Sequence, residues 1–240
     1  MPSSDTVLTV SARFNGPPKA ANGGYACGLL AAHTEDLGEG RRAVTLHAPV
    51  PVETPLLLRK AGRRTHLWAG EELIASASSE KGQIGRVDPV DIAVARTSRE
   101  RFGGQVGHPF PTCFVCGMDR ADGDGLLLTP APVPGLIRTT ACVWRPSPAV
   151  TDTRGHVPDE IVWSVLDCPG GWTADPVAEP MVLARMSAEL YTRPVVGAEY
   201  LVVARQNSRS GRTSSNTSTL YDHVGTVLGT ATAVWVAVNP

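Results

Sequence analysis

The stretch from Val157 to Trp172 constrains the fold of this chain more than any other. Pro158 suits the first position of a helix, because it lacks the backbone N–H that would have no partner there. Asp159 and Glu160 place negative charge at the positive end of the helix dipole. The apolar residues that follow leave no polar face: Ile161, Val162, Trp163, Val165 and Leu166. Because a helix that is apolar all round is buried, the sequence predicts one short interior helix, which Pro169-Gly170-Gly171 ends or kinks.

One carboxylate, Asp167, interrupts the apolar run of this helix. Burial of an unpaired carboxylate costs several kcal/mol unless the group takes up a proton. Two explanations stay open. Asp167 could accept a hydrogen bond from a backbone N–H or pair with an arginine, as structural carboxylates do. It could instead act as a general base or nucleophile in a dry pocket.

A second apolar helix is predicted between Ala20 and His33, where the residues are small. Asn22 is a good N-cap for it. Gly23 and Gly24 lower the helix propensity, but they allow another group to approach the bare backbone N–H donors at the helix start.

Most of the remaining chain consists of short runs that are typical of antiparallel strands. They cover residues 6–14, 43–50, 54–60, 65–69 and 72–78 in the first half, and 125–130, 136–144, 182–192, 199–207, 213–221 and 224–238 in the second. Residues 87–110 are expected to form a linker with a short helix. Since each half contains a strand, a loop, a buried helix and then about four strands, the pattern predicts an α+β protein of two units, residues 1–105 and 106–240.

Composition excludes several classes of function. The chain has 240 residues, of which 42% are hydrophobic, and a formal net charge of −1, so it can bury a core but offers no basic surface to nucleic acid. No apolar run approaches the length of a membrane span, and the first residues do not resemble a signal peptide. The five cysteines are odd in number and scattered, which favours a reducing cytoplasm over a disulfide framework.

Other chemical motifs are weak. Cys113 and Cys116 form a CxxC pair with His108 upstream, but a structural zinc site needs four ligands and no second CxxC exists. The pair is therefore interpreted as a turn that buries two thiols. Ser164 lacks the GxSxG surroundings of a serine hydrolase, and no phosphate-binding glycine motif occurs. The sequence implies no metal and no organic cofactor.

The segment Cys113-Phe114-Val115-Cys116-Gly117, followed by Gly125-Leu126, resembles the opening of many domains of the hotdog thioesterase superfamily. The resemblance is strongest to phenylacetate-pathway-type acyl-CoA thioesterases. Those enzymes carry His-Gly-Gly at the start of the central helix and an Asp further along it. Asn22-Gly23-Gly24 resembles the first element and Asp167 matches the second. Each half lacks the other element, because Ala31 stands in place of the acid and Pro158-Asp159-Glu160 in place of His-Gly-Gly.

This resemblance implies a double hotdog, in which two curled antiparallel sheets each wrap around a central buried helix. It also implies one composite site. Asp167 would be the base or nucleophile, and the helix start capped by Asn22 would supply the Gly23, Gly24 and Tyr25 amides as oxyanion donors. A substrate-binding role is expected for Tyr25, Trp163 and His156, against the ordinary alternatives of core packing for the first two and simple exposure for His156.

The implied activity is hydrolysis of an acyl thioester such as acyl-CoA. Two alternatives stay open: a protein that binds an acyl ligand without catalysis, and a dehydratase or hydratase acting on an enoyl thioester. The expected partner is thus a small acyl thioester, with no nucleic acid and no membrane. A homodimer formed through exposed sheet edges or helices is compatible with this plan.

Overall fold

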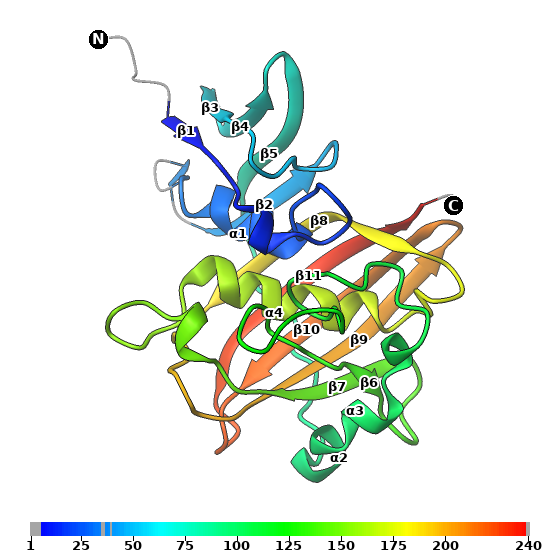
Figure 1. Cartoon of the computed structure of the whole chain (residues 1–240). Helices are drawn as coiled ribbons and strands as arrows, with labels where there is room; N and C mark the ends of the chain where they lie inside the picture. The colour runs from blue at the N-terminus through cyan, green and yellow to red at the C-terminus, as the bar shows by residue number, and fades with distance from the viewer. Residues whose placement is uncertain (1–5, 35–36, 39, 239–240) are drawn as a thin grey trace.

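A single antiparallel sheet dominates the computed structural model, which describes residues 6–34, 37–38 and 40–238. Eleven strands of this described part form the sheet in the order β1-β3-β4-β5-β2-β8-β11-β10-β9-β7-β6 (Figure 1). Their bounds are β1 Thr6–Leu8, β2 Arg41–Leu46, β3 Leu56–Ala61, β4 Arg64–Ala69, β5 Glu72–Glu80, β6 Ala131–Pro132, β7 Thr139–Trp144, β8 Met181–Leu190, β9 Tyr200–Ser210, β10 Thr213–Tyr221 and β11 Val227–Ala237.

The strands of the two halves meet at β2 and β8. Strand β2 pairs with β5 on one side and with β8 on the other, where Val44 lies opposite Met186. The expectation of two separate sheets therefore differs from the structure, in which the halves share one continuous sheet. The physical reason is that pairing β2 with β8 covers two edges that would otherwise expose unpaired backbone groups.

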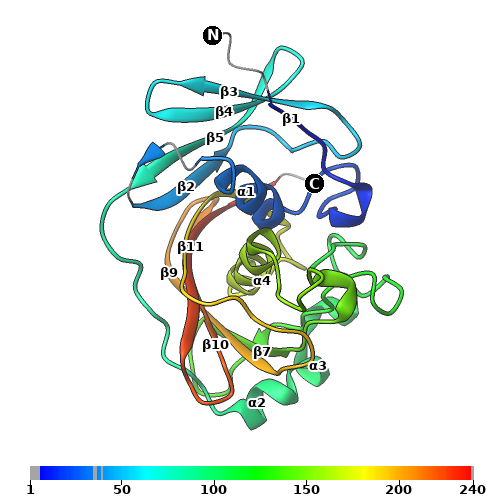
Figure 2. The ribbon, with the colours of Figure 1, turned by 90° about the vertical axis from the view of Figure 1, so that its left-hand side faces the viewer.

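Two helices occupy the concave side of this sheet. Helix α1 spans Gly23–Ala31 and helix α4 spans Asp159–Gly171, and the two lie side by side (Figure 2). The strands β7 to β11 curl around α4, all of whose residues from Ile161 to Gly171 are buried. The prediction of a buried helix is confirmed, except that it continues through Pro169 to Gly171. No helix in the described ranges is both long and apolar enough to cross a membrane.

Two of the predicted strands differ from the structure. The first ends at Leu8, because residues 12–14 turn into a 3-10 helix in which the Ser11 hydroxyl accepts a hydrogen bond from the Arg13 N–H. The segment 125–130 is extended only in part, since Leu127 has a φ of 51° and interrupts it. Its Leu126 and Leu128 N–H groups still bond to the carbonyls of Phe114 and Val115.

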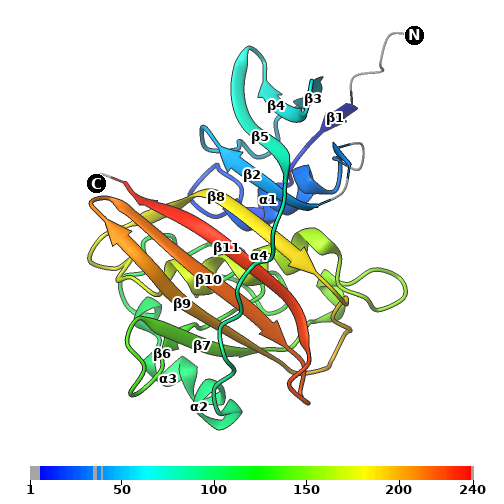
Figure 3. The same ribbon diagram turned by 180° about the vertical axis from the view of Figure 1, so that it is seen from behind.

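The linker runs across the outer face of the sheet (Figure 3). The Val87 N–H donates to the Thr219 hydroxyl and the Val87 carbonyl accepts from Tyr221, which fastens the linker to β10. Two short helices follow, α2 at Ile92–Arg96 and α3 at Ser98–Arg101. A small second core forms beneath them around Ala95, Ala141 and Val203, so the linker covers apolar surface that the sheet would otherwise expose.

Candidate active site

The site begins at the first turn of α1. The Asn22 side chain accepts a hydrogen bond from the Tyr25 N–H at 3.0 Å, and the Asn22 carbonyl accepts one from the Ala26 N–H. Asn22 is thus the N-cap, as predicted, and it satisfies one of the helix-start amides. Because its side-chain oxygen is used in this way, its amide nitrogen is left to face α4.

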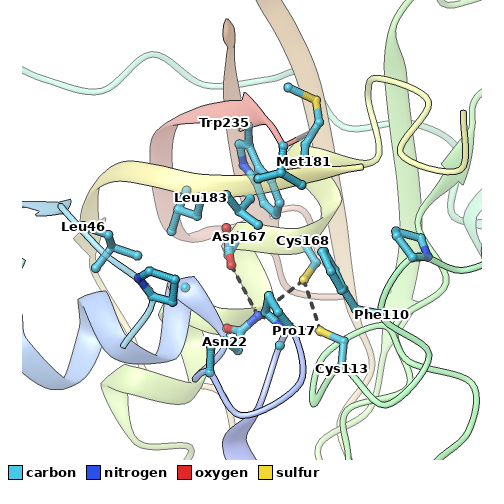
Figure 4. Close-up of a pocket in the computed structure, with 18 of the residues that line it drawn as sticks. Pro17, Asn22, Leu46, Phe110, Cys113, Asp167, Cys168, Met181, Leu183 and Trp235 are labelled. Carbon is cyan, nitrogen blue, oxygen red and sulfur yellow. Dashed lines mark hydrogen bonds between the residues drawn. The ribbon is translucent and has the colours of Figure 1, made fainter. Parts of the chain in front are cut away.

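Helix α4 brings Asp167 to this helix start. The Asp167 Oδ2 atom accepts a hydrogen bond from the Gly24 N–H at 2.8 Å. It accepts a longer one from Asn22 Nδ2 at 3.4 Å (Figure 4). Its Oδ1 atom is buried and has no hydrogen-bond partner in the described residues. The structure therefore brings together three predicted site residues from two helices. Asp167 bonds to a backbone N–H, as a structural carboxylate would, yet keeps one oxygen free.

Burial dominates the chemistry of Asp167. The side chain is 0% exposed, and its loss of hydration raises the pKa of the carboxyl group from 3.8 to about 8. The hydrogen bonds from Gly24 and Asn22 lower the pKa, whereas negative charge on Cys113 raises it. Because Oδ2 accepts both hydrogen bonds, Oδ1 is the oxygen that can take up or release a proton.

Only glycine fits at position 24. A Cβ atom there would lie 2.5 Å from the Asp167 Cβ and 2.8 Å from the Trp163 carbonyl oxygen, well inside van der Waals contact. The absence of a side chain lets α4 approach close enough for the carboxylate to reach the Gly24 amide.

A cavity of about 620 Å³ opens beside this carboxylate. Its walls are mainly apolar and come from both halves of the chain; they include Leu46, Phe110, Met181, Leu183 and Trp235 (Figure 4). Asp167, Asn22 and Gly23 are among the residues that line it. A cavity of this size with few polar groups is typical of a small-molecule site. The sequence offered no way to assign these wall residues to one pocket.

The three amides expected to bind an oxyanion are not equally available. The Gly24 N–H is bonded to Asp167, and the Tyr25 N–H is bonded to Asn22. Gly23 lines the cavity, and its N–H has no partner among the described residues. The expectation of three free donors is thus corrected: in this structure only Gly23 offers an unused one, because capping and Asp167 take the others.

None of the three expected substrate-binding residues is among the described residues that line this cavity of about 620 Å³. Tyr25 stacks on Phe14, with ring centroids 4.0 Å apart. Trp163 packs in the contact between α4 and α1 near Gly28. The N–H of His156 donates to Asp152 in a separate loop. Tyr25 and Trp163 are core residues here, and His156 is held within its own loop.

A cluster of thiols borders the same cavity and was not foreseen as a group. The Sγ atoms of Cys113, Cys116 and Cys168 all lie within 4.8 Å of one another, and each residue is buried. Hydrogen bonds from the Cys116 and Cys168 thiols hold the pKa of Cys113 well below its usual value, while the pKa values of those two thiols rise. The CxxC motif indicated two members. Cys168 could not be added from the sequence, because only folding brings α4 to this turn.

Comparisons with known proteins address the fold. No protein-family model and no curated protein matches the chain by sequence. Among solved structures, the tesB protein of Mycobacterium avium subspecies paratuberculosis superposes with a TM-score of 0.62 at 14% identity, covering 98% of this chain and 93% of that one. A conserved protein with a hot dog fold from Alicyclobacillus acidocaldarius gives 0.57 at 15% identity, covering 100% and 95%.

A proposed thioesterase from Novosphingobium aromaticivorans gives a TM-score of 0.62 at 12% identity, covering 97% of this chain and 95% of that one. At such low identity the likeness concerns the fold and not the activity. The chain has the hotdog fold, which is the fold that the sequence resemblance implied.

Proposed function

We propose that this protein hydrolyses an acyl thioester, with Asp167 as the acidic catalytic residue. One observation carries the proposal: a buried carboxylate lines an apolar cavity, is held by the amide of a facing helix start, and keeps one oxygen unpartnered in the described chain. A purely structural carboxylate gains nothing from a cavity on its free side. A general base or nucleophile needs that space for its substrate.

The two halves are interpreted as two hotdog units that share one site, with boundaries near residues 105 and 106. Helix α1 of the first unit contributes Asn22, Gly23 and Gly24, and helix α4 of the second contributes Asp167. Support comes from the contact between the two helices and from the hydrogen bond that crosses it, between Gly24 and Asp167. Neither half alone holds both the amides and the acid.

In the proposed reaction, ionised Asp167 accepts a proton from water through Oδ1. The water oxygen bonds to the thioester carbonyl carbon, and the carbonyl oxygen becomes an oxyanion. The free Gly23 N–H and the Asn22 side-chain amide are the nearest candidate donors for it. The C–S bond then breaks, the thiolate takes the proton that Asp167 holds, and a carboxylic acid remains. Direct attack by the carboxylate would form an anhydride that water then cleaves to the same products.

The cavity supports an apolar acyl group as the part of the substrate that enters. The described residues of its walls include no lysine or arginine, so the carrier of the thiol would lie outside it. Acyl-CoA is the proposed substrate, in keeping with the sequence resemblance and with the names of two structural neighbours, a tesB protein and a proposed thioesterase.

The test is thiol release from a panel of acyl-CoA esters of increasing chain length, with wild-type protein, Asp167→Asn and Asp159→Asn. Asp159 is the matched control, because it lies on the same helix but is ion-paired with Arg193 at the surface. We expect turnover by wild type and Asp159→Asn and a loss of about 10²- to 10⁴-fold for Asp167→Asn. Equal turnover by wild type and Asp167→Asn would remove this residue from the mechanism.

The same panel of acyl-CoA esters distinguishes hydrolysis from the two alternative functions, enoyl-thioester hydration and ligand binding without catalysis. Consumption of crotonyl-CoA without thiol release would indicate hydration of the enoyl thioester. Thermal stabilisation by acyl-CoA with neither reaction would indicate a protein that only binds its ligand. Either result would overturn the proposed hydrolysis.

A further inference from the structure

We propose that Cys113, Cys116 and Cys168 form a binding site for one thiophilic divalent metal ion, with zinc as the ion to test. All three residues are buried, and their sulfur atoms lie within 4.8 Å of one another. This site does not depend on the proposed hydrolysis, because its ligand atoms are the three cysteine sulfur atoms and it is measured by metal binding alone.

The spacing of the sulfur atoms suits a tetrahedral ion. A Zn–S bond of about 2.3 Å places two thiolate ligands about 3.8 Å apart along the edge of a tetrahedron. The Cys113 and Cys168 sulfur atoms are 4.0 Å apart. This separation is about twice the S–S bond of a disulfide. A small inward movement of the side chains would therefore complete three metal bonds.

The backbone around Cys113 supports the same interpretation. Cys113-Phe114-Val115-Cys116 has the CxxC spacing with which one tight turn supplies two zinc ligands. The turn closes through a hydrogen bond from the Gly117 N–H to the Cys113 carbonyl, and a side chain at Gly117 would meet the Cys113 N atom at 2.5 Å.

His108 is better placed to support the site than to be a ligand. Its Nδ1 atom accepts a hydrogen bond from the Phe110 N–H, so the neutral ring carries its proton on Nε2. That Nε2 atom lies 3.3 Å from the Cys116 sulfur, to which it can donate. The Asn22 amide nitrogen approaches Cys168 and Cys113 at 3.6 and 3.9 Å. These donors would offset part of the negative charge of three thiolates around a divalent ion.

The fourth coordination position would be filled from the cavity. All three cysteines line the cavity that also contains Asp167, so water or the thiol of a ligand can reach the ion. A site with three protein ligands and one exchangeable ligand differs from closed structural zinc sites, which use four protein ligands. This arrangement replaces the ligand set suggested by the sequence, in which His108 was the third member.

The test is zinc and cobalt binding by the full chain, reduced and stripped of metal with a chelator. We expect one Zn²⁺ per chain, and Co²⁺ to give the charge-transfer absorption of thiolate ligands, which Zn²⁺ abolishes. Cys113→Ser, Cys116→Ser and Cys168→Ser should each weaken binding more than His108→Ala, for which second-shell losses of about 10- to 100-fold are typical. Cys142→Ser is the matched control, because Cys142 is buried in β7 outside the cluster, and it should bind zinc like wild type.

A second measurement does not rely on variants that could misfold. Alkylation of wild-type thiols, followed by mass spectrometry, should show that zinc protects Cys113, Cys116 and Cys168 and leaves Cys142 unaffected. The proposal is overturned if the reduced wild-type protein binds no stoichiometric zinc, if cobalt shows no thiolate absorption, or if zinc protects none of the three thiols.

Discussion

The two ends of the α1–α4 helix pair make equivalent backbone contacts, but they carry different side chains. The second residue of each helix meets the sixth residue of the other: a Cβ at Gly24 would lie 2.9 Å from the Ser164 Cα, and one at Gly28 would lie 2.6 Å from the Glu160 Cα. The helices are thus related by an approximate twofold arrangement.

The equivalent positions hold different residues. At one end Gly24 is the second residue of α1 and faces Asp167, the ninth residue of α4. At the other end Glu160 is the second residue of α4, and Ala31 is the ninth residue of α1. The caps differ too, since Asn22 bonds to its helix whereas Pro158 makes no side-chain cap bond.

The cavities at the two ends of the helix pair also differ. The Asp167 end opens on the apolar cavity of about 620 Å³, whereas the Ala31 end borders a cavity of about 400 Å³ whose lining includes Arg41, Arg42 and Asp159. The helix contact alone therefore does not make a site. A carboxylate, an unbonded backbone amide and an apolar cavity must lie together, and among the described residues they do so at the Asp167 end.

The largest expected effect comes from moving the acid between the ends. Asp167→Ala should lower thioester hydrolysis by about 10²- to 10⁴-fold. Adding Ala31→Asp should not restore it, because that end lacks the glycine and the asparagine cap. Thiol release from acyl-CoA measures both variants, and recovery in the double variant would show that the two ends are equivalent.

Substitution of the two glycines at the crossing of α1 and α4 tests the contact between these helices. Gly24→Ala and Gly28→Ala should each lower the free energy of unfolding by about 1–3 kcal/mol, because each added methyl group meets the opposite helix. Urea denaturation measures this effect. Only Gly24→Ala should also reduce hydrolysis, since it displaces Asp167; a similar loss with Gly28→Ala would mean that helix spacing in general controls activity.

The two caps should differ in their contribution to stability. Asn22→Ala removes the bond to the Tyr25 N–H and should lower the free energy of unfolding by about 1 kcal/mol. Pro158→Ala should cost less, because Pro158 makes no side-chain cap bond. Thermal unfolding of the two variants tests this ranking, and a greater loss for Pro158→Ala would contradict it.

The smallest effect is expected at the surface of the Ala31 end. Asp159 is 2.7 Å from Arg193, and the two side chains are 42% and 55% exposed. Because water screens such pairs, Asp159→Asn should change the free energy of unfolding by less than about 1 kcal/mol. A larger loss in urea denaturation would show that this end is more tightly organised than its exposure indicates.

Local sequence patterns predicted much of the fold. Apolar periodicity, turn residues and helix caps act over a few residues. They predicted the helix that contains Asp167, the helix capped by Asn22 and most of the strands. The joining of β2 to β8 depends on pairing between segments far apart in the chain, and the local pattern does not encode it. Likewise the early end of the first strand follows from a turn at Ser11 that alternation did not indicate.

Features of the candidate site likewise fall into those that local sequence predicts and those that depend on the fold. Residue type and spacing were enough to predict that Asp167 would lie in an apolar interior and that Asn22, Gly23 and Gly24 would start a buried helix, because these local features fix burial and capping. The hydrogen bond between the Asp167 carboxylate and Gly24, and the one between the Tyr25 N–H and Asn22, are known from the folded chain. The approach of Cys168 to Cys113 and Cys116 likewise depends on the fold, since distances between distant segments arise from packing the whole chain around one sheet.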